Sequence, residues 1–206
     1  MVSDPVLAAS LATLPPPGII VDHRLITIGD EHALLSEEAG AFRRSAVQVR
    51  RASGAARIVA RALLDRLGHE RVALPKSPAG PPIWPKGVLG SLAHDFRVAI
   101  AAVGTAGSVA GIGIDIEPAQ PLSPDLLELV TTPRERAMID SDPYRGRSFF
   151  VVKEAVYKAV FPLDRSFLEH HDVEVDLANR KATLRNGRVV NVRFCISTHL
   201  VALAFF

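Results

Sequence analysis

Two carboxylates alternate with isoleucines in the middle of the sequence. Residues 111–117 read GIGIDIE, which places Asp115 and Glu117 two residues apart. On a strand the isoleucines would face one side and both carboxylates the other, roughly 6–7 Å apart. Carboxylate oxygens suit Mg²⁺, which takes one or two of them together with waters and substrate phosphate oxygens. Taken alone, the pair is also explained by the exposed face of an edge strand.

A second group of charged residues occupies the stretch KEAVYK at residues 153–158. On a helix Glu154 and Lys158 are four residues apart and share a face. Such a pair is commonly a surface salt bridge of small energetic value. The functional alternative is that Glu154 supplies a third carboxylate to a metal site while Lys158 neutralises phosphate charge.

The third candidate is the segment Gly90-Ser91-Leu92-Ala93-His94. His94 closes an expected strand where a short turn begins, and Ser91 lies before it on the loop side. A histidine in this position is often structural, but near a pyrophosphate it could donate a hydrogen bond to an oxygen.

Positive charge is concentrated between residues 43 and 86, where only Asp65 and Glu70 oppose it. This distribution suits a polyanionic small ligand or an acidic partner surface, and a solvated basic helix face is the alternative. The whole chain has 24 Lys+Arg against 22 Asp+Glu, a formal charge of +2, which is too small to indicate nucleic-acid binding. The basic residues of the segment are Arg43, Arg44, Arg50, Arg51, Arg57, Arg61, Arg66, Arg71, Lys76 and Lys86.

Composition favours an ordinary globular protein of one large or two small domains, since the 206 residues are 48% apolar and 22% charged. No apolar run reaches transmembrane length, and the first ten residues lack the basic region of a secretory signal. The single cysteine, Cys195, is expected to pack as a small apolar residue. We therefore predict a cytoplasmic protein.

Periodicity predicts an α+β fold in which each half mixes helices with mostly antiparallel strands. The division expected is 1–106, with basic helices, a proline-rich loop and the Ser91–His94 strand, and 107–206, with the carboxylate strand, the KEAVYK helix and C-terminal strands. Ser36 is expected to open a helical stretch, and Ser53 to cap a helix over Gly54–Leu67.

The remaining elements are predicted from turn and capping signals. Thr132 to Glu135 reads as a capping box, and Asn186-Gly187 as a hairpin turn. The expected elements are a strand region over Gly18–Gly29, strands Leu89–His94, Arg97–Val103 and Gly111–Glu117, a helix over Gly146–Phe161 ending at Pro162, and strands Asp172–Leu177, Lys181–Arg185, Val189–Ser197 and His199–Phe206.

Taken together and in this order, these motifs resemble the 4'-phosphopantetheinyl transferases of the surfactin-synthetase type, most closely the enterobactin-synthetase component D branch. Residues 111–117 resemble the family's strand motif, and FVVKEAVYK at 150–158 resembles its helix motif. GPPIWP at 80–85 is similar to the family's proline-rich loop. Residues 90–94 are similar to its G-S-x-S-H strand, with Ala93 where the family usually has serine. The resemblance covers about residues 43–162.

The resemblance implies two similar halves about a pseudo-twofold axis, with coenzyme A in the cleft between them. Asp115, Glu117 and Glu154 would hold Mg²⁺, and Glu154 would be the base, directly or through a metal-bound water. Lys158 and His94 would neutralise phosphate charge. The residues expected to bind coenzyme A are Arg51, Arg57, Lys76, Ser91, His94, Asp115, Glu154 and Lys158, with Arg51, Arg57 and Lys76 on the 3'-phosphate.

The implied reaction transfers 4'-phosphopantetheine from coenzyme A to a serine of an apo acyl or peptidyl carrier protein. Its products are the holo-carrier and adenosine 3',5'-bisphosphate, and the branch suggests siderophore peptide synthesis by a monomeric enzyme. The stretch Pro118–Ser148, where leucines stand beside Arg134 and Arg145, is the expected docking surface for the carrier. The same leucines could instead pack inward.

Two other classes of function remain to be weighed against this one. A non-catalytic coenzyme A- or nucleotide-binding regulatory module would keep the cationic segment and Trp84 but would not need three converging carboxylates. A nucleic-acid-binding protein would leave Asp115 and Glu117 unexplained, and few aromatic residues are interleaved with the basic ones. Magnesium-dependent release of adenosine bisphosphate separates these classes.

Overall fold

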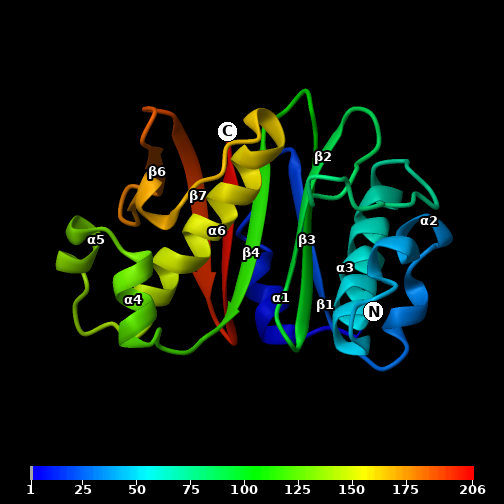
Figure 1. Cartoon of the computed structure of the whole chain (residues 1–206), viewed down its shortest axis with the longest axis horizontal. Helices are drawn as coiled ribbons and strands as arrows, with labels where there is room; N and C mark the ends of the chain where they lie inside the picture. The colour runs from blue at the N-terminus through cyan, green and yellow to red at the C-terminus, as the bar shows by residue number, and fades with distance from the viewer. Residues whose placement is uncertain (1) are drawn as a thin grey trace.

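The computed structural model of the chain describes residues 2–206 as a mixed α+β fold with two antiparallel sheets, each packed against one long helix (Figure 1). The first sheet has the order β1-β3-β2 and the second the order β4-β8-β7-β6-β5. The strands are β1 (Ile19–Leu25), β2 (Val88–His94), β3 (Val98–Thr105), β4 (Ile112–Pro118), β5 (Val173–Asp176), β6 (Lys181–Leu184), β7 (Val189–Ile196) and β8 (His199–Phe205).

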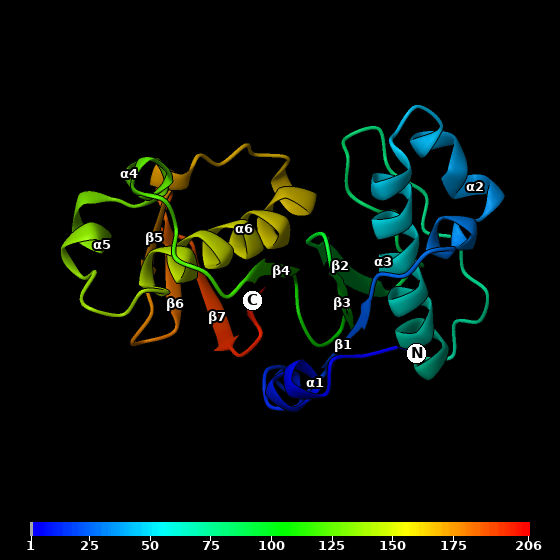
Figure 2. The same cartoon turned by 90° about the horizontal axis from the view of Figure 1, so that it is seen from below.

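Helices and short 3-10 segments complete each half. Seen from below, α3 and α6 flank the central strands from opposite ends of the molecule (Figure 2). The α-helices are α1 (Pro5–Leu11), α2 (Ser36–Ala39), α3 (Val47–Arg66), α4 (Pro124–Val130), α5 (Pro133–Ala137) and α6 (Arg145–Asp164), and the 3-10 segments are η1 (Asp30–Ala33), η2 (Gly40–Phe42) and η3 (His170–Asp172). No helix within residues 2–206 is both long and apolar enough to cross a bilayer.

Helix α3 forms because Val59, Leu63 and Leu64 recur on one face and bury against β3. It begins at Val47, so the predicted start with Ser53 as N-cap was wrong. Ser53 and Gly54 lie inside the helix, and a Cβ at Gly54 would stand 1.9 Å from the carbonyl oxygen of Asp30. The glycine is therefore a site of close packing against η1 and not a helix boundary. Helix α2 begins at Ser36 as predicted, and Leu35 is its N-cap.

Helix α6 packs on the second sheet through Val152, Ala155 and Val156. The glycines of the GIGIDIE strand make this approach possible, since a Cβ at Gly113 would stand 1.9 Å from the carbonyl oxygen of Ala155. The helix continues through Pro162 to Asp164 and ends where Arg165 adopts a left-handed conformation. The predicted end at Pro162 was therefore two residues too early. The predicted β2–β3 hairpin, the Thr132–Glu135 capping box and the four C-terminal strands are confirmed.

A buried glutamate at the start of a short helix recurs in both halves. Glu38 in α2 accepts hydrogen bonds from the N–H groups of Leu35 and Leu74 and pairs with Arg61 of α3 at 2.9 Å. Glu135 in α5 accepts hydrogen bonds from the N–H groups of Thr132 and Val175 and pairs with Lys153 of α6 at 2.7 Å. Each glutamate thus fastens a short helix and a later backbone segment to the long helix of its half. This repeated arrangement fits two similar halves.

An apolar cluster joins the halves, and a buried hydrogen bond connects β2 with β4. Ile100 of β3, Ile114 of β4 and Leu203 of β8 share this cluster, which Leu7 of α1 closes from outside. Ser91 of β2 accepts a hydrogen bond from the N–H of Ile114 at 3.0 Å. Strands β2 and β4 therefore run side by side where the two sheets meet, which places the Ser91–His94 segment next to the carboxylate strand.

Candidate active site

The predicted metal carboxylates lie where β4 meets α6. Asp115 on β4 is buried, with 7% of its surface exposed. Its Oδ1 accepts a hydrogen bond from Nζ of Lys158 at 2.7 Å, so the partner of Lys158 is this aspartate and not Glu154. Glu117 faces Nη1 of Arg147 at 2.6 Å. Both carboxylates are thus neutralised by cations of α6, a helix that faces β4 along its length.

The pKa is raised for three carboxylates in this region, Asp115, Glu117 and Glu154. Burial raises the pKa of Asp115, although the nearby Lys158 ammonium opposes the shift. Burial and then the charge of Asp115 raise the pKa of Glu117. Burial, followed by Asp115 and with a smaller effect of Glu117, raises the pKa of Glu154. Mutual repulsion among carboxylates is relieved by a cation, so the donor set and its electrostatics fit a hard divalent metal.

The side chains as they stand do not form a closed metal cage. Within residues 2–206 no group of three or more His, Cys, Asp or Glu side chains is arranged to hold a metal ion. Asp115 and Glu117 are turned toward Lys158 and Arg147 instead. Metal binding would therefore exchange these ammonium and guanidinium partners for the ion.

His94 approaches the same region from the other half of the molecule. Its imidazole is exposed at the end of β2. Desolvation by the surrounding protein lowers the pKa of His94, with a further contribution from the Lys158 ammonium, while Asp95 and Asp115 oppose the shift. His94 is therefore within electrostatic reach of Lys158 and Asp115 from the other half.

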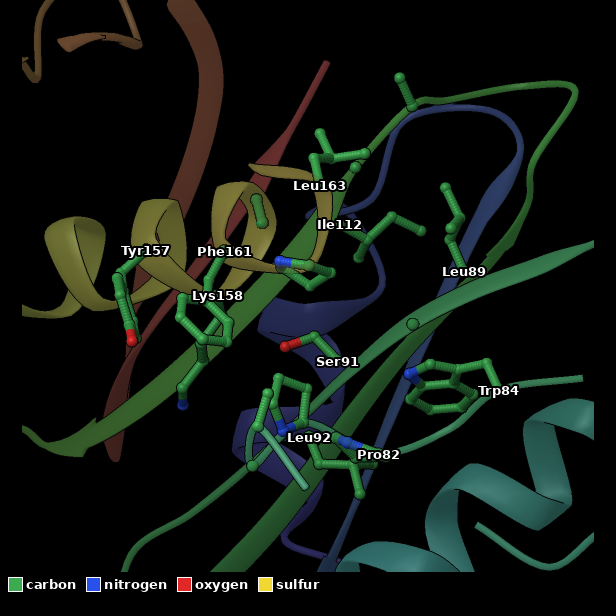
Figure 3. Close-up of a pocket in the computed structure, with 18 of the residues that line it drawn as sticks. Pro82, Trp84, Leu89, Ser91, Leu92, Ile112, Tyr157, Lys158, Phe161 and Leu163 are labelled. Atoms are coloured by element: carbon green, nitrogen blue, oxygen red, sulfur yellow. The ribbon is translucent and has the colours of Figure 1, made fainter. Parts of the chain in front are cut away.

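A cavity of about 520 Å³ opens beside this cluster, between the proline-rich loop and α6 (Figure 3). Trp84 and Pro82 line one side, and Tyr157 and Phe161 of α6 line the other. Lys76, Ser91 and Lys158 are among its polar lining residues. Gly90 allows the indole to lie on β2, because a Cβ there would stand 2.6 Å from the Trp84 ring. A largely apolar cleft with a few charged groups is typical of a small-molecule site.

The cationic residues predicted to bind the 3'-phosphate are not brought together. Only Lys76 lines the cavity. Arg57 is 4% exposed; its Nε donates to the carbonyl of Leu74 and its Nη1 to that of Ser53, which directs it into the interior. Arg51 forms a two-pronged ion pair with Glu31, at 2.9 and 3.1 Å. Ser91 is also buried, and its hydroxyl oxygen already accepts the hydrogen bond that joins β2 to β4.

Two family models match this chain in succession. The model of the 4'-phosphopantetheinyl transferase N-terminal domain matches residues 37–104, and that of the 4'-phosphopantetheinyl transferase superfamily matches residues 111–204. The chain belongs to the 4'-phosphopantetheinyl transferase superfamily.

Curated relatives agree with this family assignment. The 4'-phosphopantetheinyl transferase Svp of Streptomyces mobaraensis is 33% identical over 173 residues, covering 80% of this chain and 70% of its own. PptT of Mycobacterium tuberculosis is 36% identical over 145 residues, covering 68% and 64%, and Npt of Nocardia iowensis is 39% identical over 137 residues, covering 64% and 62%. The chain therefore spans slightly less than two thirds of two of these relatives.

A solved structure of the holo-[acyl-carrier-protein] synthase of Thermotoga maritima is a more distant match. It is 20% identical, with a TM-score of 0.38, and the match covers 47% of this chain and 62% of that one. The family assignment rests on the family models and the curated relatives.

In this superfamily member, several residues near the site were missed by sequence reasoning. Arg147 pairs with Glu117, and Asp95 pairs with His199 across the halves. Their partners lie far away in the sequence, so no local pattern marks them. Lys153 belongs to the recognised helix motif, yet its ammonium is buried against Glu135 and points away from the cavity. Its position among Val151, Val152 and Ala155 was the available signal for burial.

Proposed function

We propose that this chain transfers the 4'-phosphopantetheine group of coenzyme A to a serine hydroxyl of an apo acyl or peptidyl carrier protein. The observation that carries the proposal is the contact of Asp115 with Lys158, which lines a cavity between the halves of a member of this superfamily, with Glu154 and His94 within electrostatic reach. The serine oxygen forms a bond to the phosphorus next to pantetheine, and the bond to the bridging oxygen breaks. Adenosine 3',5'-bisphosphate leaves.

Asp115, Glu117 and Glu154 would hold a magnesium ion, which would supply Lewis-acid stabilisation of the pyrophosphate. The electrostatics of the site support this assignment, because burial raises the pKa of all three carboxylates and the charge of Asp115 raises that of Glu117 and Glu154 further. Lys158 would then be free to turn from Asp115 toward a phosphate oxygen. The metal ion is thus proposed to replace Lys158 as the positive partner of Asp115.

Glu154 is the proposed base for the serine hydroxyl. Burial and the charges of Asp115 and Glu117 raise the pKa of Glu154, which makes its carboxylate a stronger proton acceptor than a free glutamate. His94 would donate a hydrogen bond to the pyrophosphate from the opposite half. Lys76 lines the cavity and is the proposed contact for the 3'-phosphate. Arg57 and Arg51 instead bind the Leu74 carbonyl and Glu31 within the protein.

The carrier is proposed to dock on α4 and α5, next to Glu154. Leu126, Leu129 and Met138 are exposed apolar residues of this segment, and the Arg134 side chain is 78% exposed beside them. Arg145 is less available, because it pairs with Asp140 and Asp142. An apolar surface rimmed by arginine complements an acidic carrier helix. The motif resemblance makes a peptidyl carrier of siderophore synthesis the first carrier class to test.

The experiment is a transfer assay with purified protein, coenzyme A, an apo-carrier and Mg²⁺. Intact-mass spectrometry of the carrier should show addition of phosphopantetheine, with adenosine 3',5'-bisphosphate released in equal amount. Chelation of Mg²⁺ and the Asp115→Ala variant should each abolish both signals. Tight binding of coenzyme A without any carrier modification, across acyl and peptidyl carriers, would favour a regulatory module instead.

A further inference from the structure

A buried aspartate–histidine contact bridges the two halves directly beside His94. Asp95 follows His94 in the turn between β2 and β3, and His199 begins β8 in the other half. The Asp95 Oδ2 and His199 Nε2 atoms are 3.0 Å apart, and the two side chains are 6% and 4% exposed. The proposed function uses neither residue.

The Asp95 carboxylate also shapes the turn that carries His94. Its Oδ1 accepts hydrogen bonds from the N–H groups of Arg97 and Val98, each at 2.6 Å. Burial alone would raise the pKa of Asp95, but the contacts with His199, Val98 and Arg97 outweigh it and leave the pKa below its usual value. One carboxylate therefore fixes the turn with one oxygen and reaches the second half with the other.

His199 is held on its other side as well. Its Nδ1 lies 3.1 Å from the hydroxyl of Thr198, and this hydroxyl donates to Oδ2 of Asp4 at 2.9 Å. The N–H of Asp4 donates in turn to Nε2 of His23 on β1, at 3.1 Å. The contacts thus run from the first half to the second and back, which fixes the orientation of the imidazole.

The register of the strands places this pair at the catalytic end of the interface. Ser91 on β2 accepts its hydrogen bond from Ile114 on β4, and three residues further along each strand stand His94 and Glu117. His199 lies opposite Pro118, the residue after Glu117. Asp95 therefore directly follows His94, and His199 directly precedes Leu200, the residue opposite Glu117.

We propose that Asp95 and His199 are positioning residues that set the place of His94 relative to Asp115 and Glu117. This inference rests on the proposed function, in which groups from both halves act on one pyrophosphate. The apolar cluster between the halves resists separation, but hydrophobic contact is not directional. The close contact between Asp95 and His199 joins two side chains that are each held by further hydrogen bonds, so it restricts the relative position of the elements that carry them. A displacement of about 1 Å at a reacting centre can cost roughly 100-fold in rate.

A double-mutant cycle on kcat tests the proposal, with His94→Ala, His199→Ala and the combined variant. If His199 acts through His94, His199→Ala should lower kcat by roughly 10–100-fold in the parent and by less than about 3-fold once His94 is absent. His199→Gln, which keeps a side-chain N–H donor, should recover most of the loss. Val190→Ala, in the core of the second half and away from this interface, is the matched control and should have the same effect in both backgrounds.

Equal losses from His199→Ala with and without His94 would overturn the proposal, because a residue that merely supports folding acts independently of His94. Amide hydrogen exchange gives a second readout that needs no transferase activity. The Arg97 and Val98 amides should exchange faster in His199→Ala than in the parent. In His199→Gln they should exchange at the parental rate. Unchanged exchange in His199→Ala would also overturn the proposal. A parent protein with no transfer activity would sink the proposed function, and the exchange comparison would still test the pair.

Discussion

The ammonium of Lys153 provides a sharp test of how this fold is held together. Its Nζ lies 2.7 Å from Glu135 and donates to the carbonyls of Val130 and His170, both at 2.8 Å. The Lys153 and Glu135 side chains are 1% and 0% exposed. Lys153→Met keeps the apolar stem and removes all three contacts, which leaves a buried carboxylate without its cation.

The expected cost follows from the state of Glu135 after this change. Breaking a buried ion pair by removing one partner typically costs about 3–5 kcal/mol, because the remaining charge stays desolvated. The N–H groups of Thr132 and Val175 still bond to Glu135, which argues for the lower part of this range, while the two orphaned carbonyls add to the cost. For a chain of this size the melting temperature should fall by roughly 6–20 °C.

Urea denaturation of the parent and of Lys153→Met measures the free energy of unfolding directly. Lys153→Met with Glu135→Gln should recover part of the loss, because the buried charge is removed. Lys181→Met, on an exposed lysine that bonds only to Asn191, is the control and should change stability by less than about 0.5 kcal/mol. A loss below about 1 kcal/mol for Lys153→Met would refute the reasoning and would point to a catalytic role for this lysine.

Three further predictions follow from the site. Glu154 has a raised pKa in the folded chain, so its ionised form destabilises the fold above that pKa, and the effect vanishes below the unfolded value near 4.5. Without metal, Glu154→Gln should therefore be more stable than the parent at pH 7 and equal to it at about pH 4, and Mg²⁺ should raise the melting temperature of the parent only. Calorimetry should show that coenzyme A lacking its 3'-phosphate binds the parent more weakly than coenzyme A does, and that Lys76→Ala removes this difference. If Lys76→Ala still binds coenzyme A more tightly than the ligand without the 3'-phosphate, the phosphate lies elsewhere. Arg57→Ala should instead lower the free energy of unfolding. Arg134→Glu should raise KM for the carrier and leave KM for coenzyme A unchanged, with an effect that shrinks at higher salt, whereas unchanged carrier kinetics would move the docking site off α5.

Local patterns were sufficient to predict most of the secondary structure. The β2–β3 hairpin, the Thr132–Glu135 capping box and the C-terminal strands follow from alternation, turn residues and caps that act over a few residues. The errors occurred where packing overrides a local signal. Gly54 was interpreted as a boundary of α3, but the absent side chain allows the helix to contact η1.

The candidate site was predicted unevenly for the same reason. Asp115 and Lys158 lie within hydrogen-bonding distance, because each motif sets the face of one element and α6 packs along β4. Arg57 and Arg51 could not be placed from the sequence. Their partners, the Leu74 carbonyl and Glu31, are brought near only when α3 packs against distant loops.

The sequence by itself determined the family, the two α+β halves and the residue types available for phosphate and metal chemistry, because these are written in motifs and periodicities of short range. Only the tertiary structure decided which charges are free to act. In the fold, Arg57 and Lys153 bind partners in the interior, whereas Lys76 lines the cavity. Asp95 contacts His199 of the other half. The physical reason is that the cost of a buried charge depends on partners from other elements, which only the folded chain brings within bonding distance.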